Sequence, residues 1–132
     1  MLVVKTKLGL SKLNGIGLFA DQDITKGIIV WKNNPELSFI KFTEKEWKGL
    51  GRELSEECFK QIKNYGYKYK KDGNYYLDID NTRFINHSRN PNLVEDESKN
   101  DIAIKDIKKG EEILMDYTSF FDKDYLKDAD YL

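Results

Sequence analysis

The chain has 132 residues, with 22 Lys and Arg against 23 Asp and Glu, and its formal net charge is −1. This length predicts a single domain, because domains cluster near about 100–150 residues. A hydrophobic content of 39%, including 7 Phe, 8 Tyr and 2 Trp, excludes a disordered or fibrous chain. The balanced charge argues against a dedicated nucleic-acid site, which usually requires a basic surface.

Neither a membrane anchor nor a secretory signal is expected. The longest apolar run, at 28–31, is far shorter than the roughly 20 residues that span a bilayer. The first five residues lack the basic and apolar pattern of a signal peptide. Cys58 is the only cysteine, which excludes an intrachain disulfide and a thiolate zinc site. These features predict an intracellular, cytoplasmic protein, with a nuclear or host-nuclear location left open.

The first half of the chain combines short strands with one helical region. Strands are predicted over about 3–8 and 28–32, with a glycine loop at 14–17 between them. The helical region is predicted over about 43–64, where Thr43 and Glu46 have the spacing of a capping box. Gly49 and Gly51 are expected to interrupt this region, and Ser55 can cap a second helix.

For the second half of the chain, the sequence predicts strands and turns. Residues 65–70 and 74–79 flank Lys-Asp-Gly at 71–73, which predicts a hairpin. Further strands are predicted at 102–105 and 111–117. The pattern Asp-Ile-x-Lys-Gly occurs at 23–27 and again at 106–110, and we interpret it as reused turn chemistry rather than a repeat unit. The sequence therefore predicts a mostly-β single domain with one short helical insertion.

Three segments carry residue types suited to chemistry. Gly15 and Gly17 allow a backbone to approach a ligand closely, although an ordinary turn explains them as well. Residues 83–92 hold the only histidine among amides and a hydroxyl, which also suits a polar turn. Residues 110–117 end in an acid and a phenol, Asp116 and Tyr117. One histidine can form neither a multi-histidine metal site nor a convincing hydrolytic triad.

Taken in order, these segments resemble the SET domain of protein-lysine methyltransferases, of the minimal bacterial or viral type. Gly-Ile-Gly-Leu-Phe-Ala at 15–20 is similar to the first family motif. Arg-Phe-Ile-Asn-His-Ser at 83–88, with Pro-Asn at 91–92, is similar to the most diagnostic one. Gly-Glu-Glu-Ile at 110–113, with Asp-Tyr at 116–117, is similar to the last. The resemblance covers about 15–117 and implies one SET domain over 1–132, built of several small sheets.

The resemblance also implies how the domain works. Residues 83–92 would pass beneath the C-terminal segment in a pseudoknot, S-adenosylmethionine would bind on one face, and a substrate lysine would enter from the other. Tyr117 would be the catalytic residue. The implied cofactor-binding residues are Asn14, Gly15, Ile16, Gly17, Arg83, Asn86, His87 and Tyr117. The implied substrate channel includes Tyr76, Phe120 and Phe121, the last two in an aromatic tail at 118–132.

The chain departs from the family pattern at several points. Arg89 replaces a cysteine, and with Cys58 alone no zinc is expected. Lys32 and Asn33 stand where the family often has Glu-Tyr, so one channel aromatic is missing. The tyrosines that could replace it are Tyr65, Tyr67, Tyr75 and Tyr76. The number of methyl groups transferred is therefore left open.

The main hypothesis is an S-adenosylmethionine-dependent protein-lysine N-methyltransferase. Its partner would be a lysine-containing protein or peptide, with a histone or histone-like protein as one option. The alternative is a catalytically inactive SET-like module that binds cofactor or peptide. A weaker option is a binder of nucleic acid or acidic partners through the lysine-rich middle. The oligomeric state is left open.

Overall fold

The computed structural model describes residues 1–127, and in this range strands outnumber helices. The strands are β1 (Thr6–Leu10), β2 (Ile16–Ala20), β3 (Ile29–Trp31), β4 (Phe39–Phe42), β5 (Tyr67–Lys68), β6 (Tyr75–Asp78), β7 (Asn86–His87), β8 (Leu93–Glu95), β9 (Asp101–Ala103) and β10 (Leu114–Met115). The α-helices are α1 (Glu44–Glu53), α2 (Glu56–Tyr65) and α3 (Lys123–Lys127). Short 3₁₀ turns, η1 (Asn81–Phe84) and η2 (Tyr117–Ser119), follow β6 and β10. The predicted mostly-β class is confirmed, while the first strand lies at 6–10 instead of 3–8.

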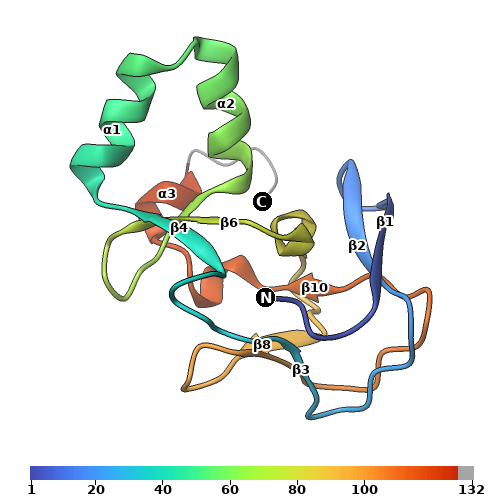
Figure 1. Cartoon of the computed structure of the whole chain (residues 1–132). Helices are drawn as coiled ribbons and strands as arrows, with labels where there is room; N and C mark the ends of the chain where they lie inside the picture. Colours follow the sequence, from blue (N-terminus) through green and yellow to red (C-terminus); the bar gives the residue numbers. More distant parts are fainter. Residues whose placement is uncertain (128–132) are drawn as a thin grey trace.

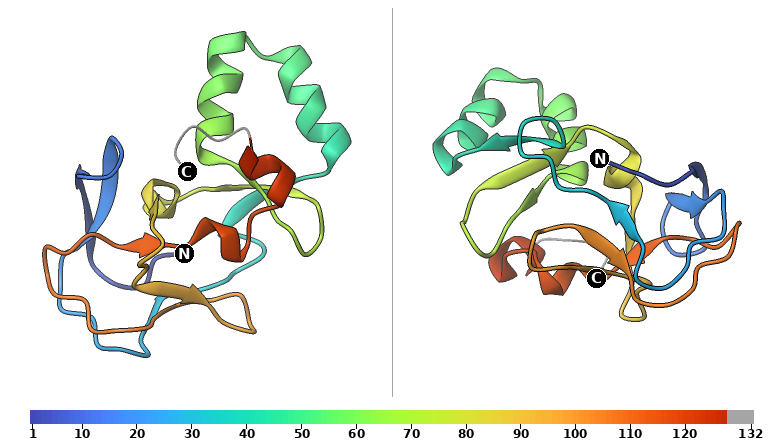
Figure 2. Two further views of the ribbon diagram at one scale, coloured as in Figure 1. Left: turned by 180° about the vertical axis from the view of Figure 1, so that it is seen from behind. Right: turned by 60° about the horizontal axis from the view of Figure 1, so that its bottom comes forward.

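The strands form four small sheets. β1 and β2 make an antiparallel hairpin, β4, β6 and β5 make one three-stranded sheet, and β3, β9 and β8 make another. In Figure 1, α1 and α2 project from one side of the molecule, and β3 and β8 lie on the opposite side. Figure 2 shows the β1–β2 hairpin standing apart from the helices in both further views. The C-terminal segment, with β10 and η2, crosses between these parts. No helix in residues 1–127 is long and apolar enough to cross a membrane.

The helical insertion begins where its caps predict. Thr43 Oγ1 accepts from Glu46 N at 3.2 Å, and Glu46 Oε1 accepts from Thr43 N at 3.0 Å, which completes the capping box. Ser55 caps α2 through Cys58 N. The predicted interruption at 49–51 is wrong, because α1 continues through both glycines.

The reason for this continuity is tertiary packing. A Cβ on Gly51 would lie only 2.8 Å from Cε1 of Phe59, so the glycine lets α2 pack closely against α1. Phe59 also packs on Trp47, with ring centroids 5.9 Å apart. This contact outweighs the roughly 1 kcal/mol that a glycine costs inside a helix.

The two Asp-Ile-x-Lys-Gly segments pair with each other. Ile24 N donates to Ile107 O at 2.7 Å, and Ile107 N donates to Ile24 O at 2.8 Å. Their aspartates act reciprocally, since Asp106 accepts from Lys26 N and Asp23 accepts from Lys109 N. Gly27 and Gly110 both adopt positive φ, of +91° and +93°. The two largely exposed turns thus pair through the buried Ile24 and Ile107 and join the first half of the chain to the second.

The segment at 83–92 is joined to the C-terminal segment, as the predicted pseudoknot requires. β7 pairs with β10 in parallel, Asn86 opposite Leu114 and His87 opposite Met115. Asn92 is only 6% exposed, and its side chain both accepts from Leu114 N and donates to Glu112 O, each at 2.8 Å. Two segments far apart in sequence are therefore held side by side, and each contributes residues to the candidate site.

Candidate active site

A cavity of about 360 Å³ lies beside the loop between β1 and β2, and we call it the glycine-loop cavity. Its volume lies within the range of about 300–1,000 Å³ that is usual for small-molecule sites. Backbone and side chains from five parts of the chain meet around it. They are Leu13, Asn14, Gly15, Ile16, Asn64, Tyr65, Gly66, Arg83, Phe84, Asn86, His87, Tyr117 and Phe121.

Asn86 and Glu112 hold the glycine loop in place. Asn86 Nδ2 donates to Asn14 O at 3.1 Å, to Ile16 O at 3.2 Å and to Glu112 Oε1 at 3.0 Å. Glu112 Oε2 accepts from Ser11 Oγ at 3.0 Å. Gly17 does not line the cavity: a Cβ there would lie 2.2 Å from Glu112 Oε1. Gly17 thus makes room for the carboxylate that anchors the loop.

His87 is held as a neutral imidazole. Its Nδ1 accepts from the backbone N–H of Tyr117 at 3.0 Å, which requires that Nδ1 carry no proton. Burial lowers the pKa of His87, in agreement with this neutral form, while Asp116 acts in the opposite direction. The 3.7 Å contact between His87 Nδ1 and Asp116 is therefore not an ion pair in this arrangement. His87 therefore holds the backbone of the C-terminal segment at Tyr117, where this segment lines the glycine-loop cavity.

One wall of the glycine-loop cavity is aromatic and cationic. The Tyr65 and Phe84 rings meet edge to face with centroids 5.2 Å apart. The Arg83 guanidinium lies 5.7 Å from the Tyr65 centroid and 5.2 Å from that of Phe84. Such a wall suits a ligand that combines a flat ring with a carboxylate and a positive centre.

A second cavity, of about 300 Å³, is also lined by Tyr117, and we call it the aromatic cavity. Its ring stack begins at Tyr117, which stacks on Phe121 with centroids 4.5 Å apart. Phe121 stacks on Tyr67 at 4.9 Å, and Tyr67 stacks on Tyr76 at 5.8 Å. Phe120 packs edge-on against Tyr67 and also lines the cavity. The aromatic part of this cavity suits the apolar stem of a long side chain.

The two cavities meet at one place. Tyr65, Arg83, Tyr117 and Phe121 line both of them. The Tyr117 hydroxyl donates to the carbonyl oxygen of Ile85. The residue Ile85 is 4% exposed. This bond ties the C-terminal segment to the chain just before β7 and positions the phenol where the cavities join. Ligands bound in the two cavities would therefore approach each other near these shared residues.

The far end of the aromatic cavity is acidic. Asp78, at the end of β6, and Asp101, at the start of β9, are 8% and 7% exposed and both line it. Burial, and then repulsion by Asp80, raises the pKa of Asp78 to about 7. Burial, and then the charge of Asp78, raises the pKa of Asp101 well above its usual range. Glu95 lies nearby but is held by the Tyr69 hydroxyl at 2.7 Å and by Lys71 Nζ at 3.3 Å.

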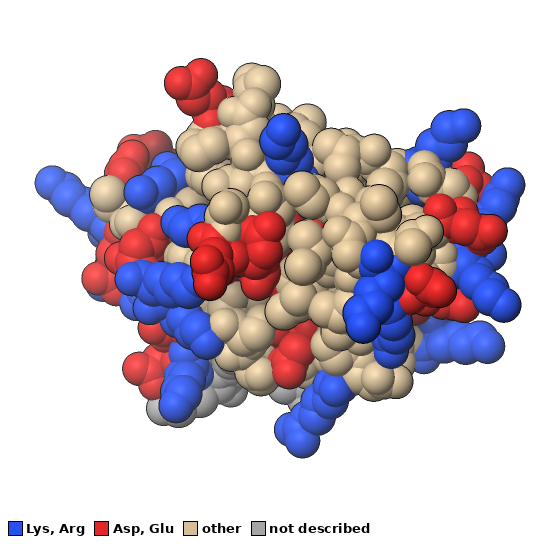
Figure 3. All heavy atoms as spheres, turned by 90° about the horizontal axis from the view of Figure 1, so that it is seen from below, with Lys and Arg blue, Asp and Glu red and all other residues tan. Residues whose placement is uncertain are grey.

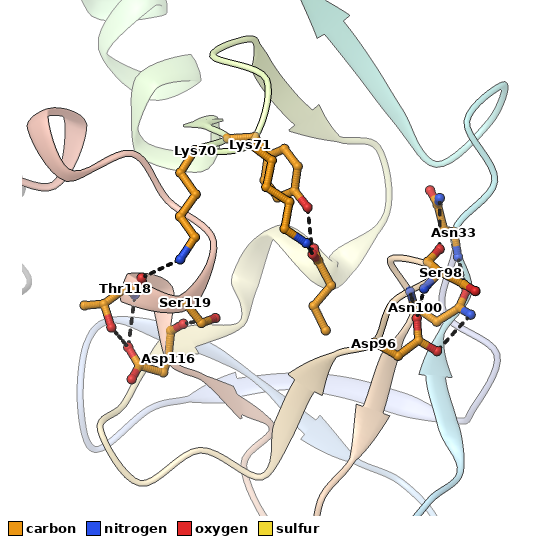
Figure 4. A network of polar contacts seen from close by, with 11 residues as sticks. Asn33, Lys70, Lys71, Asp96, Ser98, Asn100, Asp116, Thr118 and Ser119 are labelled. Carbon is orange, nitrogen blue, oxygen red and sulfur yellow. Dashed lines mark hydrogen bonds and ion pairs between the residues drawn. The ribbon is translucent and has the colours of Figure 1, made fainter.

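The loop at 96–100 borders this acidic end and is held by polar contacts. Asp96 Oδ1 accepts from Ser98 N and Asn100 N, each at 2.8 Å. Asn33 N donates to Asn100 Oδ1 at 2.9 Å, so this loop holds Asn33 beside the cavity (Figure 4). Asn33 therefore lies where the resemblance implied a missing channel aromatic.

Most of the residues implied by the resemblance come together. Asn14, Gly15, Ile16, Arg83, Asn86, His87 and Tyr117 line the glycine-loop cavity, and Tyr76, Phe120 and Phe121 line the aromatic one. Of the tyrosines proposed to replace the missing aromatic, Tyr65, Tyr67 and Tyr76 line the aromatic cavity, whereas Tyr75 stacks on Trp47. Tyr131, in the predicted aromatic tail, lies outside the described residues. The roles of all these residues remain predictions.

Sequence reasoning missed several residues of the site. Glu112 belongs to a quoted motif but was given no role, and Tyr65 and Phe84 were not assigned to the cofactor side. Asp78 and Asp101 gave a weak signal, since one is an acid at the end of an apolar segment and the other an acid at the start of one. Their convergence across two sheets is visible only in the structure.

Charge and metal-ligating groups are spread out. On the face shown in Figure 3, basic and acidic side chains are interspersed, and much of the centre carries neither. Among the described residues, no three His, Cys, Asp or Glu side chains are placed to hold a metal ion. Cys58 is exposed on α2, outside the three motifs at 15–20, 83–88 and 110–117.

Comparisons with known proteins agree with this geometry. The SET domain family model matches residues 15–118. A Chaetomium thermophilum polycomb repressive complex 2 structure, bound to S-adenosylmethionine, is 26% identical with a TM-score of 0.65, over 94% of this chain and 16% of that one. The Neurospora histone lysine methyltransferase DIM-5 is 25% identical with a TM-score of 0.57, over 88% of this chain and 53% of that one.

This chain thus spans about a sixth of the polycomb chain and about half of DIM-5. No curated protein matches it in sequence. The family match covers most of the chain, and the three sequence motifs contribute residues to the linings of the two cavities. The chain belongs to the SET domain family.

Proposed function

We propose that the chain is an S-adenosylmethionine-dependent protein-lysine N-methyltransferase. The observation that carries the proposal is that two cavities share Tyr65, Arg83, Tyr117 and Phe121 in their linings. A methyl donor bound in one cavity and an acceptor bound in the other would be aligned near these residues, and alignment alone can contribute roughly 7–11 kcal/mol to such a transfer.

The glycine-loop cavity fits the donor. The backbone of residues 14–16 lines it, and the Arg83 guanidinium offers a partner for a carboxylate. Tyr65 and Phe84 provide ring faces for an adenine and a cationic sulfur. S-adenosylmethionine would supply a methyl group on a sulfonium, whose carbon an uncharged amine would attack in line, so that the C–N bond forms as the C–S bond breaks and the neutral thioether leaves. The solved polycomb structure that binds this cofactor has the same fold.

The aromatic cavity fits the acceptor. A lysine ammonium, with a pKa near 10.4, must lose a proton, which costs about 4.6 kcal/mol at pH 7. The rings of Tyr67, Phe120 and Phe121 exclude water, and together with a nearby positive charge this lowers the ammonium pKa. The Tyr117 hydroxyl donates its hydrogen bond to Ile85 O, so we assign Tyr117 the role of aligning the reacting atoms. A histone or another lysine-rich protein is the proposed substrate, by analogy with DIM-5.

The test is methyl transfer from labelled S-adenosylmethionine to histones and lysine peptides, with cofactor affinity measured separately by calorimetry. Tyr117→Phe keeps the ring and is expected to slow transfer by about 10²–10³ while cofactor affinity changes little. Tyr75→Phe is the matched control, because Tyr75 stacks on Trp47 outside both cavities. Equal rates for wild type and Tyr117→Phe would contradict the mechanism. Cofactor binding without any transfer would favour the inactive module instead.

A further inference from the structure

The outer edge of β1 is an unpaired strand edge. Just beyond the end of β1, Ser11 N donates to Gly15 O at 2.8 Å, so the odd-numbered residues of this strand bond to β2. The N–H and C=O groups of Thr6, Leu8 and Leu10 therefore point away from β2. Within residues 1–127, none of these groups bonds to another segment. A strand edge of this kind is a template for pairing with another chain.

The same strand exposes two leucines. Leu10 is 87% exposed and Leu8 is 41% exposed. Both point to one face of the hairpin, because residues two apart on a strand share a face. Neither lines the glycine-loop cavity or the aromatic cavity. The hairpin stands apart from the helices (Figure 2), so the helices leave this edge open to a second chain.

The opposite edge of the hairpin is already covered. Ala20 N donates to Glu111 O at 2.9 Å, and Ile113 N donates to Leu18 O at 2.8 Å. An additional strand can therefore join this hairpin only beside β1. If that strand is β1 of a second copy, each copy covers the free edge of the other. The assembly then closes as a two-fold dimer and does not grow into a fibre.

We propose that β1 is the interface of a symmetric homodimer, in which the β1 strands of two copies pair in antiparallel and join the hairpins into one four-stranded sheet. Leu8 of one copy lies opposite Leu8 of the other, on the two-fold axis, and Thr6 lies opposite Leu10. In this register every outward N–H and C=O of the three residues finds a partner. Because the strands are antiparallel, the two glycine loops lie at opposite ends of the sheet.

The charges of β1 select this register. With Leu8 opposite Leu8, Lys7 faces Gly9 of the other copy, so no lysine of the strand faces another lysine. A shift of two residues in one direction would place Lys7 directly opposite Lys7, which is unfavourable for like charges. The same shift in the other direction would place Thr6 opposite Lys12, beyond the end of the strand. A shift of one residue would turn the outward groups of Leu8 toward groups that already bond to β2.

Disulfide cross-linking tests the register. Leu8→Cys and Leu10→Cys are oxidised in a Cys58→Ser background, which removes the exposed native thiol. The paired positions 8 would have Cα atoms about 5.5 Å apart, within the roughly 4.4–6.8 Å that a disulfide spans. The two positions 10 would be separated by roughly 13 Å along the strand. Leu8→Cys should therefore form covalent dimers at least about 10-fold faster, although Leu10 is the more exposed side chain.

Sedimentation of the full chain measures the association itself. Wild type is expected to change from the mass of one chain to that of two between about 1 and 100 μM, as suits a small interface. Leu8→Pro removes an N–H that bonds only to the second copy, and it should raise the Kd at least about 10-fold. Leu10→Ser should also weaken the dimer. Leu37→Ser is the matched control, since Leu37 is 59% exposed and lies outside the hairpin.

Three results would overturn the inference. The first is the mass of a single chain at every concentration up to about 1 mM. The second is cross-linking of Leu10→Cys as fast as that of Leu8→Cys. The third is a dimer that Leu10→Ser weakens no more than Leu37→Ser, because the two copies would then meet elsewhere. If Leu8→Pro loses its melting transition, the cross-linking and Leu10→Ser decide. Methyl transfer is not read in either experiment, so the dimer and the proposed function fail separately.

Discussion

The contact between Gly17 and Glu112 leads to the sharpest prediction. A Cβ at position 17 would lie 2.2 Å from Glu112 Oε1 and 2.9 Å from its Cδ, so Gly17→Ala must displace the carboxylate. That carboxylate accepts hydrogen bonds from Asn86 Nδ2 and Ser11 Oγ, both at 3.0 Å. Hydrogen bonds to charged groups contribute about 1.5–3 kcal/mol each, so losing one or two of them should cost about 2–4 kcal/mol.

Displacement of the Glu112 carboxylate should also affect the glycine-loop cavity. Asn86 also donates to Asn14 O and Ile16 O, so a displaced Glu112 leaves the loop that lines the glycine-loop cavity less well anchored. Gly17→Ala is therefore expected to lower the melting temperature by about 3–5 °C per kcal/mol of lost stability. It should also weaken S-adenosylmethionine binding, measured by calorimetry.

A double-mutant cycle tests the cause. In the Glu112→Ala background the clash is gone and only Ser11 Cβ, at 3.2 Å, remains close, so Gly17→Ala should then cost less than about 1 kcal/mol. Gly15→Ala is the control: nothing lies within 4 Å, but its φ of +50° costs an L-residue about 1–2 kcal/mol. That cost should be the same with or without Glu112. If the Gly17 and Glu112 effects add within about 0.5 kcal/mol, the reasoning fails.

Three further predictions concern stability. Gly51→Ala should destabilise by about 1–3 kcal/mol, since its Cβ would lie 2.8 Å from Phe59, whereas Gly49→Ala, with only Arg52 at 4.0 Å, should be neutral or stabilising by up to about 1 kcal/mol. Denaturant titration of both variants checks this, and equal effects would contradict it. The pKa of Asp78, about 7 against a usual 3.8, means that the folded protein binds more protons than the unfolded chain between those values. The contribution of Asp78 to stability should therefore fall by roughly 4 kcal/mol at most as the pH rises from about 4 to 7, and Asp78→Asn should remove this part of the pH dependence in melting scans. EDTA should change neither melting temperature nor methylation, and recovery of a chelated sample with zinc would refute the expectation of a zinc-free domain.

Local chemistry alone was sufficient to predict several elements. The capping box of Thr43 and Glu46, the cap at Ser55 and the turn at Gly73 involve groups within three or four residues of one another. Such contacts depend little on the remainder of the chain, so they can be predicted from the sequence alone. The ordered motifs at 15–20, 83–88 and 110–117 likewise predicted which segments would meet, and they do meet around the two cavities.

Other features depended on contacts between distant parts of the chain. Gly51 looks like a helix breaker until Phe59 packs against it, and Tyr65 is indistinguishable from Tyr75 until the first faces the cavities and the second stacks on Trp47. Asp78 and Asp101 are unremarkable strand-end acids in sequence.

Asp78 and Asp101 come together only because two separate sheets approach each other and bury both side chains at one cavity, which Trp31 and its unpaired indole N–H also line. Burial and the proximity of like charges are properties of the packed chain, because the free energy of a charge depends on all the groups that surround it. The sequence by itself therefore determined the family, the caps and the turns. The tertiary structure decided which side chains share a cavity and which carboxyl groups have their pKa raised by burial within it.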